Sequence, residues 1–154
     1  MDSTTQLNSL SVSTGKDKLS QPNNRLTITE ILYFLDESFS VYSKDQCILT
    51  SLNPPEYEFV VEAVYNYYEY AKSIGYEFAY DGVSSFWLND GKGWRLIDKG
   101  DLKDSLQIAA ATIGLKDNAK CCHFRFRREL LEQFKEDYCL PNLLNELNKE
   151  GVKQ

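Results

Sequence analysis

Apolar side chains recur every three or four residues along the first half of the chain, which is the spacing of one helix face. The first such stretch follows Thr27 and Glu30, which have the spacing of a capping box. It predicts a short helix over residues 28–38, with an inner face of Ile28, Ile31, Leu32 and Leu35. Residues 39–52 keep no clear period, and short extended pieces are one interpretation of them.

The second predicted helix has the clearest start. Asn53 can cap it, the two prolines that follow suit its first turn, and Gly75 is a natural stop. Its opposite side carries Glu58, Glu62 and Glu69. The simplest interpretation of this acidic stripe is a solvated face, which an amphipathic helix needs. The inner face consists of Phe59, Val60, Ala63, Val64, Tyr67, Tyr68, Ala71 and Ile74.

At residue 76 the period of the pattern changes from 3.6 residues to two, the period of a strand. Apolar and polar residues alternate over 76–80, and two further short runs follow at 83–88 and 94–97. An Asp-Gly pair and a longer stretch with two glycines predict the turns between these runs. Three short strands joined in this way form an antiparallel meander.

The two tryptophans of the meander are assigned to different faces. Phe86 and Leu88 share one face of the second strand, so Trp87 between them lies on the other. A three-stranded sheet needs cover on its apolar face. Trp94 is predicted to share that covered face, and Trp87 is predicted to point to solvent.

Three more helices are predicted after the meander, over residues 98–113, 125–138 and 142–150. The fold class is therefore α+β, a three-stranded antiparallel meander packed by about five α-helices. It is expected to form a single domain, residues 25–151. Residues 1–24 are rich in Ser, Thr, Asn, Gln and Lys and are predicted to be a disordered tail.

Composition narrows the class of protein. The chain is 42% hydrophobic and 26% charged, a globular balance, and its net charge of −6 opposes general affinity for nucleic-acid phosphates. Residues 1–24 hold no apolar core of a signal peptide, and no run approaches the length of a membrane span. We therefore expect a cytoplasmic protein with no membrane partner, whose four cysteines are reduced thiols.

Cys121, Cys122 and His123 are the residues that suggest metal or nucleophile chemistry. Zinc sites usually space paired ligands by two to four residues, and these cysteines are adjacent. Cys121 and His123 would share a face of an extended segment, but no signature supplies the third group that orients a catalytic base. The stretch 90–93 lacks the length and the hydroxyl residue of a phosphate-binding loop. We therefore predict a protein that is not an enzyme, with no metal ligands, cofactor or small-molecule substrate.

Basic and aromatic residues interleave after Lys120. Such groups together can hold phosphate and stack on bases, and the tip of the meander adds further candidates. The alternative is that the arginines pair with Glu129, Glu132 or other acids. The predicted contact residues for nucleic acid or a protein partner are Trp87, Lys92, Trp94, Arg95, Arg125, Arg127 and Arg128.

The acidic stripe on the second helix supports a different partner. Glu58, Glu62 and Glu69, with exposed tyrosines such as Tyr57 and Tyr65, would present a negative surface to a basic protein. Electrostatic steering makes such contacts fast and specific. This arrangement suits an inhibitor that imitates nucleic acid.

One stretch carries a family resemblance. Residues 78–82 (Phe-Ala-Tyr-Asp-Gly) and 86–91 (Phe-Trp-Leu-Asn-Asp-Gly), with Trp94 and the capped helix that follows, resemble a small module of phage, plasmid and poxvirus-type primase–helicases. In that family the module lies just before the helicase motor. The match covers about residues 76–113 and lacks a Walker lysine and a primase acid cluster, so neither activity is implied. The resemblance implies a phage-like or mobile-element origin and an adaptor that touches replication proteins or DNA.

Two functions remain open at this point. The first is a non-enzymatic binding module of a phage-like or mobile element, a replication-associated adaptor that contacts DNA or replication proteins. The second is an acidic protein-binding inhibitor, a nucleic-acid mimic or anti-defence protein, that uses the helix around residues 56–69.

Overall fold

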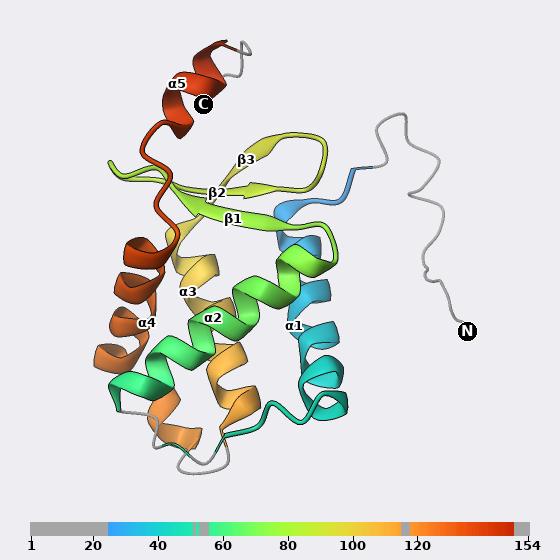
Figure 1. Ribbon diagram of the computed structural model, residues 1–154, viewed down its shortest axis with the longest axis vertical. Coiled ribbons are helices and arrows are strands. Elements are labelled where there is room, and N and C mark those ends of the chain that lie inside the picture. Colours follow the sequence, from blue (N-terminus) through green and yellow to red (C-terminus); the bar gives the residue numbers. More distant parts are fainter. Residues whose placement is uncertain (1–24, 51, 53–55, 115–117, 150–154) are drawn as a thin grey trace, which may run out of the picture.

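The sheet lies between a layer of helices and one short helix (Figure 1). The computed structural model describes residues 25–50, 52, 56–114 and 118–149. They form the predicted α+β fold, with three antiparallel strands and five α-helices among the described residues. The predicted tail, residues 1–24, and the predicted cap, Asn53, lie outside the described residues.

Helix α1 spans Ile28–Asp45. The Thr27 hydroxyl accepts the N–H of Glu30 at 3.0 Å, and the Glu30 carboxylate accepts the N–H of Thr27 at 2.9 Å, which confirms the capping box. The interpretation of residues 39–45 as extended is wrong. Phe39 and Ser43 are buried and continue the stripe of Leu35 at four-residue spacing, so packing carries the helix on.

Helix α2 spans Tyr57–Ser73 and brings aromatic rings into the core. The Tyr67 ring meets Phe39 edge-on, with centroids 5.6 Å apart, and stacks on Phe78 at 5.8 Å. Gly75 has a φ of +102°, a left-handed conformation that favours glycine and stops the helix as predicted. These aromatic contacts tie α2 to both α1 and the sheet.

Strands β1 (Glu77–Tyr80), β2 (Phe86–Asn89) and β3 (Trp94–Ile97) form the predicted antiparallel meander in sequence order. The predicted tight turn at Asp81-Gly82 is instead a loop over residues 81–85. The Asp81 carboxylate accepts the N–H groups of Val83, Ser84 and Ser85 at 2.9–3.1 Å. This network holds those residues out of the ladder, so β2 begins at Phe86.

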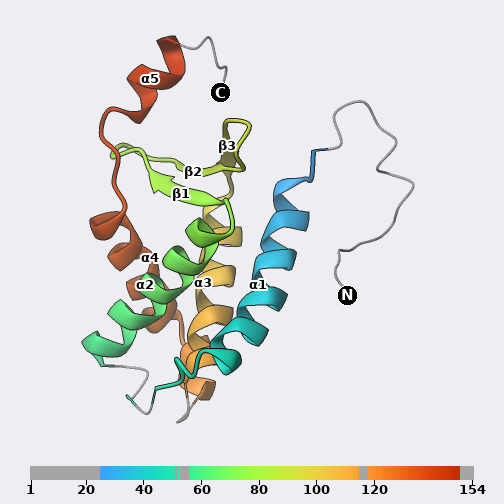
Figure 2. The same cartoon turned by 45° about the vertical axis from the view of Figure 1, so that its right-hand side comes forward.

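Helix α3 (Lys99–Ile113) is capped by Asp98, whose carboxylate accepts the N–H of Asp101 at 3.1 Å. The 3-10 helix η2 (Asn118–Cys122) leads into α4 (Phe124–Asp137). Helices α1 to α4 cover one face of the sheet, and a second view shows the same layer (Figure 2). None of the described helices is both long and apolar enough to cross a bilayer.

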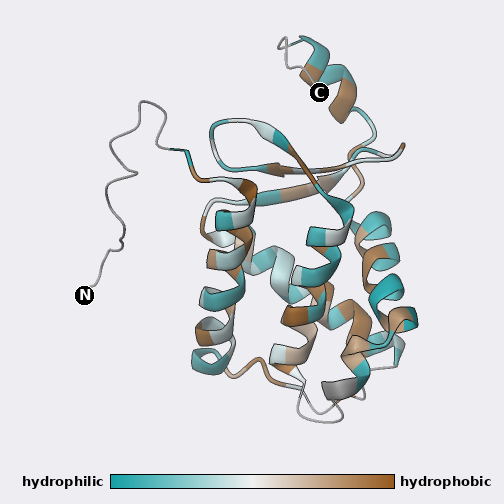
Figure 3. Ribbon diagram, turned by 180° about the vertical axis from the view of Figure 1, so that it is seen from behind, coloured by the Kyte–Doolittle hydropathy of each residue, from teal (hydrophilic) through white to brown (hydrophobic). Residues whose placement is uncertain are grey.

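Helix α5 (Leu143–Lys149) lies beyond the sheet, on the side away from the other helices (Figure 1). Two clusters of buried side chains result. The larger lies between the sheet and α1 to α4, and the smaller joins Ala79 and Trp87 of the sheet to Leu143 and Leu147 of α5. Figure 3 shows apolar stretches in the strands and along every helix, including α5.

Candidate functional site

Trp87 is not a surface residue, and the prediction that it faces solvent is wrong. Its side chain is 1% exposed and lies between Ala79 and the α5 leucines Leu143 and Leu147. Its Nε1–H donates to the Asp81 carboxylate at 3.1 Å. The face that was assigned to solvent is the one that α5 covers, so Trp87 cannot contact a partner while α5 is in place.

Trp94 and Lys92 do not join Trp87 in one exposed surface. Trp94 is opposite Asn89, and Leu96 is opposite Trp87, so both tryptophans lie on the α5 side of the sheet. The assignment of Trp94 to the opposite face from Trp87 is therefore wrong. Trp94 is half-buried there, while Lys92 is exposed at the hairpin tip.

Arg95 serves the fold. Its guanidinium donates to the Asp90 carboxylate at 3.0 Å and to the carbonyl of Leu26 at 2.6 Å. Arg25 donates to the same carboxylate at 2.8 and 3.0 Å. The hydrogen bond from Arg25 is the main reason that the pKa of Asp90 falls to about 2. Arg95 and Arg25 together join the start of the described chain to the hairpin.

The arginines of α4 divide between two roles. Arg127 forms an ion pair with Asp104 of α3, so it links two helices. Arg125 and Arg128 are exposed, and the Arg128 guanidinium lies 6.0 Å from the ring centroid of Phe124, which is itself 65% exposed. The rings of His123 and Phe124 are stacked, with centroids 5.0 Å apart. We name His123, Phe124, Arg125 and Arg128 the basic corner.

Cys121 and Cys122 have unlike surroundings. Cys121 is buried, and burial raises the pKa of its thiol to about 11, which makes it a poor nucleophile at neutral pH. Cys122 is exposed and its sulfur accepts the Nε2–H of Gln107 at 3.2 Å. His123 caps α4, with its Nδ1 accepting the N–H of Arg125 at 3.1 Å. Within the described ranges, no three potential metal ligands come together.

The acidic residues of α2 lie as predicted. Glu58, Glu62 and Glu69 are all exposed, and they follow one stripe of the helix at spacings of four and seven residues. None of them forms an ion pair with another described residue. Tyr65 lies between them on the same stripe and is 54% exposed. The stripe therefore presents three carboxylates whose charge is not neutralised within the described fold.

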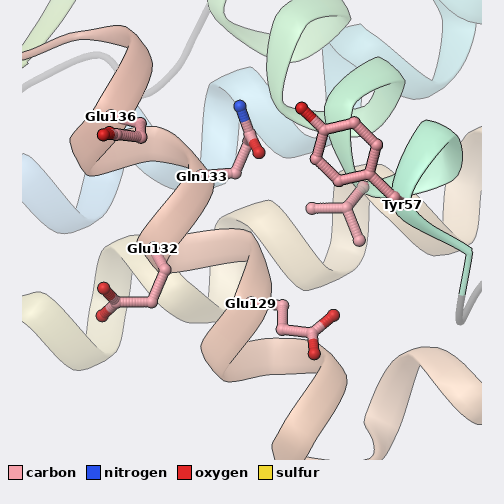
Figure 4. Close-up of a pocket in the computed structure, with 6 residues that line it drawn as sticks. Tyr57, Glu129, Glu132, Gln133 and Glu136 are labelled. Atoms are coloured by element: carbon pink, nitrogen blue, oxygen red, sulfur yellow. The ribbon is translucent and has the colours of Figure 1, made fainter.

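Helices α2 and α4 form a groove of about 440 Å³ between them. Figure 4 shows Tyr57 of α2 across from Glu129 and Gln133 of α4, with Glu132 and Glu136 extending along the other side of α4. Tyr57 is 70% exposed, and Val60 is the apolar residue of the lining. We name the α2 carboxylates Glu58, Glu62 and Glu69, together with Glu129, Glu132 and Glu136 of α4, the acidic face.

The sequence did not predict the α4 half of this face. The first turn of α4 has no acidic residue and carries arginines, while its last turn carries Glu136 and Asp137 together with Lys135. Acids at the C-terminal end and arginines at the N-terminal end are less favourable for the helix dipole than the reverse order, and Lys135 offsets part of this effect.

No family model, curated protein or solved structure matches this chain. The resemblance of residues 76–113 to the module of primase–helicases therefore stays a prediction.

A further acidic residue was missed by the sequence pattern. Asp36 of α1 lies in a recess of about 190 Å³ between α1 and α3, near Asp101 and Asp104. Tyr67 and Ser105 donate hydrogen bonds to its carboxylate, each at 3.4 Å. Burial is the largest cause that raises the pKa of Asp36 to about 6. Its position on the helix gave no signal, because the burial depends on α3.

Replacing Asp36 by asparagine is expected to raise the free energy of unfolding at pH 7 by about 1 kcal/mol, discounted for partial exposure of the carboxylate. Because its folded pKa lies above the unfolded one, the native chain binds the proton more tightly between about pH 4 and 6. Stability therefore falls as pH rises through that window, and Asp36→Asn removes this fall. Urea unfolding at several pH values measures it, with Asp45→Asn, an exposed residue of α1, as the control. Equal pH slopes in both variants would contradict the assignment.

Proposed function

We propose that this chain is a non-enzymatic binding module whose acidic face receives a basic segment of a partner protein. The observation that carries the proposal is the number of exposed carboxylates on α2 and α4. Glu58, Glu62 and Glu69 of α2 are exposed and form no ion pair with another described residue, and Glu129, Glu132 and Glu136 of α4 line the groove between the two helices, where Glu132 pairs with Lys135.

The chemistry of the face suits a cationic peptide. Carboxylates on two helices attract a basic segment at long range and hold it in register at short range. The ring of Tyr57 offers an aromatic surface to an arginine or lysine side chain beside the groove. Tyrosines are favoured contact residues because they add a large contact area and lose little conformational entropy on binding. A partner whose ordinary ligand is nucleic acid would carry such a segment, which keeps an inhibitor role within the proposal.

Nucleic acid, the other candidate partner, has less support from the geometry. Of the seven residues predicted for it, Trp87 is buried, Arg95 binds Asp90, and Arg127 binds Asp104. The basic corner keeps Arg125 and Arg128 beside the exposed ring of Phe124. That corner favours a second function, contact with single-stranded nucleic acid by phosphate pairing and base stacking, as in a replication-associated adaptor.

Binding of a short fluorescein-labelled arginine-rich peptide tests the first function. The double variant Glu58→Lys/Glu62→Lys is expected to weaken binding by about 10-fold or more at about 50 mM salt. The matched control is Asp45→Lys/Glu146→Lys, which changes the net charge equally at exposed positions outside the face. The control is expected to weaken binding by less than about 3-fold, because distant charges are screened.

Two results would reject the acidic face as the binding site. One is an equal loss of affinity in both double variants, which would assign binding to net charge alone. The other is the absence of peptide binding at low salt.

The second function is tested in the same assay with single-stranded DNA as the labelled probe and Arg125→Glu/Arg128→Glu as the variant. DNA binding that is absent at low salt would rule the second function out.

A further inference from the structure

The outer face of the sheet is covered by α5, which the views of Figures 1 and 2 both place apart from the layer of α1 to α4. The contact is apolar. Leu143 and Leu147, four residues apart and each 1% exposed, lie against Ala79 and Trp87, with Leu144 and Trp94 at the edge. This cluster is separate from the main core and from the acidic face.

The docking of α5 itself rests on these side chains. Among the described residues, no hydrogen bond or ion pair joins residues 143–149 to the sheet, and the hydrogen bonds of Leu143 and Glu146 to Leu140 and Asn142 are local. The backbone is anchored just before α5, where the N–H of Tyr80 donates to the carbonyl of Tyr138 at 2.9 Å and the N–H of Leu140 donates to the carbonyl of Tyr80 at 2.8 Å. Isolated helices shorter than about 12–15 residues are marginal in water, and α5 has 7. Helix α5 is therefore folded because it is docked, and it can open without the rest of the domain.

The surface beneath α5 has the character of a binding site. Trp87 lies opposite the small Ala79 on β1 and opposite Leu96 on β3, and Leu96 is 45% exposed even with α5 in place. Because Ala79 is small, there is room beside the indole for a leucine side chain that approaches from the outer face of the sheet. Buried aromatic anchors in apolar slots are typical of the residues that dominate binding energy.

We infer that the outer face of the sheet is a helix-docking site, occupied in cis by α5, which a leucine-bearing amphipathic helix of a partner protein takes when α5 leaves. Helix α5 itself shows the chemistry that the site accepts, namely leucines at i and i+4 that reach Trp87 and Ala79. A partner helix longer than α5 would add contacts to Trp94 and Leu96. The site extends the proposed function to a second surface and does not depend on the acidic face.

The two tryptophans of the chain report on this site directly. In the full-length ¹⁵N-labelled chain, Leu143→Ser/Leu147→Ser is expected to shift the Trp87 indole resonance and to increase acrylamide quenching about 3-fold. The Trp94→Phe variant assigns the two resonances. When a synthetic peptide of residues 142–149 is added to this double variant at millimolar concentration, the Trp87 resonance is expected to return toward its position in the unmodified chain. The same peptide with serine in place of Leu143 and Leu147 is the control. Little change is expected when the peptide meets the unmodified chain, because the tethered α5 has a high effective concentration.

A second measurement needs no variant. In the unmodified chain, the amides of α5 are expected to exchange with solvent about 100-fold faster than those of β2, through local opening. Equal protection of α5 and β2 would overturn the inference, because α5 would then open only with the whole domain. An unmoved Trp87 resonance in the double variant, or equal shifts from both peptides, would also overturn it. If the unmodified chain instead forms a concentration-dependent dimer, the inferred partner protein would be wrong, and the helix that docks would be the α5 of a second copy of the chain.

Discussion

Replacing Trp87 by alanine is expected to lower the free energy of unfolding by about 3–5 kcal/mol. The indole is 1% exposed, and the substitution leaves a cavity between the sheet and α5. It also removes the N–H that the Asp81 carboxylate accepts at 3.1 Å. Urea unfolding at pH 7, followed by far-ultraviolet circular dichroism, measures the loss.

Trp94→Ala is the matched control. Trp94 lies on the same face but is half-buried, so its removal is expected to cost about 1–2 kcal/mol, in proportion to the smaller apolar area lost. A loss below about 0.5 kcal/mol for Trp87→Ala, the size usual for surface positions, would mean that Trp87 faces solvent after all.

The sequence pattern was sufficient where a local signal decides the structure. The capping box at Thr27 and the stop at Gly75 each act within a few residues, and both are present. The change of period at residue 76 likewise predicted the meander, because strand alternation is a local property of the backbone. The exception is the end of α1, where burial of Phe39 against Tyr67 and Tyr70 extends a helix that the local pattern left open.

The position of Trp87 could not be predicted from the local sequence pattern. Alternation separates Trp87 from Phe86 and Leu88, but it cannot say that both faces of the sheet are covered. The last helix was predicted over residues 142–150, yet its place on the sheet depends on how the chain turns after Cys139. The identity of the element was therefore predictable and its docking partner was not.

The candidate site divides in the same way. Exposure of Glu58, Glu62 and Glu69 follows from helix periodicity, so the α2 stripe could be predicted. The groove required knowing that α4 is the neighbour of α2, a long-range fact that the pattern does not hold. Arg95 was assigned to the surface for a related reason, since one of its partners, Leu26, lies 69 residues away in the sequence.

Asp90→Asn is expected to lower the free energy of unfolding at pH 7 by about 2–3 kcal/mol, because it leaves Arg95 and Arg25 without their shared carboxylate. The Asp90 side chain is 6% exposed, and those of Arg25 and Arg95 are 31% and 24% exposed. The Nε–H of Arg95 is already buried without a hydrogen-bond partner, so Asp90→Asn leaves this arginine with the carbonyl of Leu26 as its remaining charge-free acceptor among the described residues.

The loss is expected to depend on pH in a defined direction. The hydrogen bond from Arg25 holds the folded pKa of Asp90 at about 2, below the unfolded value of about 3.9. Stabilisation by the ion pairs is therefore complete above about pH 4 and is lost as pH falls through about 2. The difference between the unmodified chain and Asp90→Asn should accordingly shrink to below about 1 kcal/mol near pH 2.

A double-mutant cycle with Arg25→Gln assigns the effect to the pair. The coupling between the two substitutions is expected to be about 1–2 kcal/mol at pH 7, because Arg25 meets both carboxylate oxygens of Asp90. The coupling should vanish as Asp90 is protonated, since a neutral carboxyl no longer attracts the guanidinium. Urea unfolding of the four proteins between pH 7 and pH 2 measures this. Additive losses at pH 7, or a coupling that does not change with pH, would show that the hairpin is held to the start of α1 by Arg95 and the backbone alone.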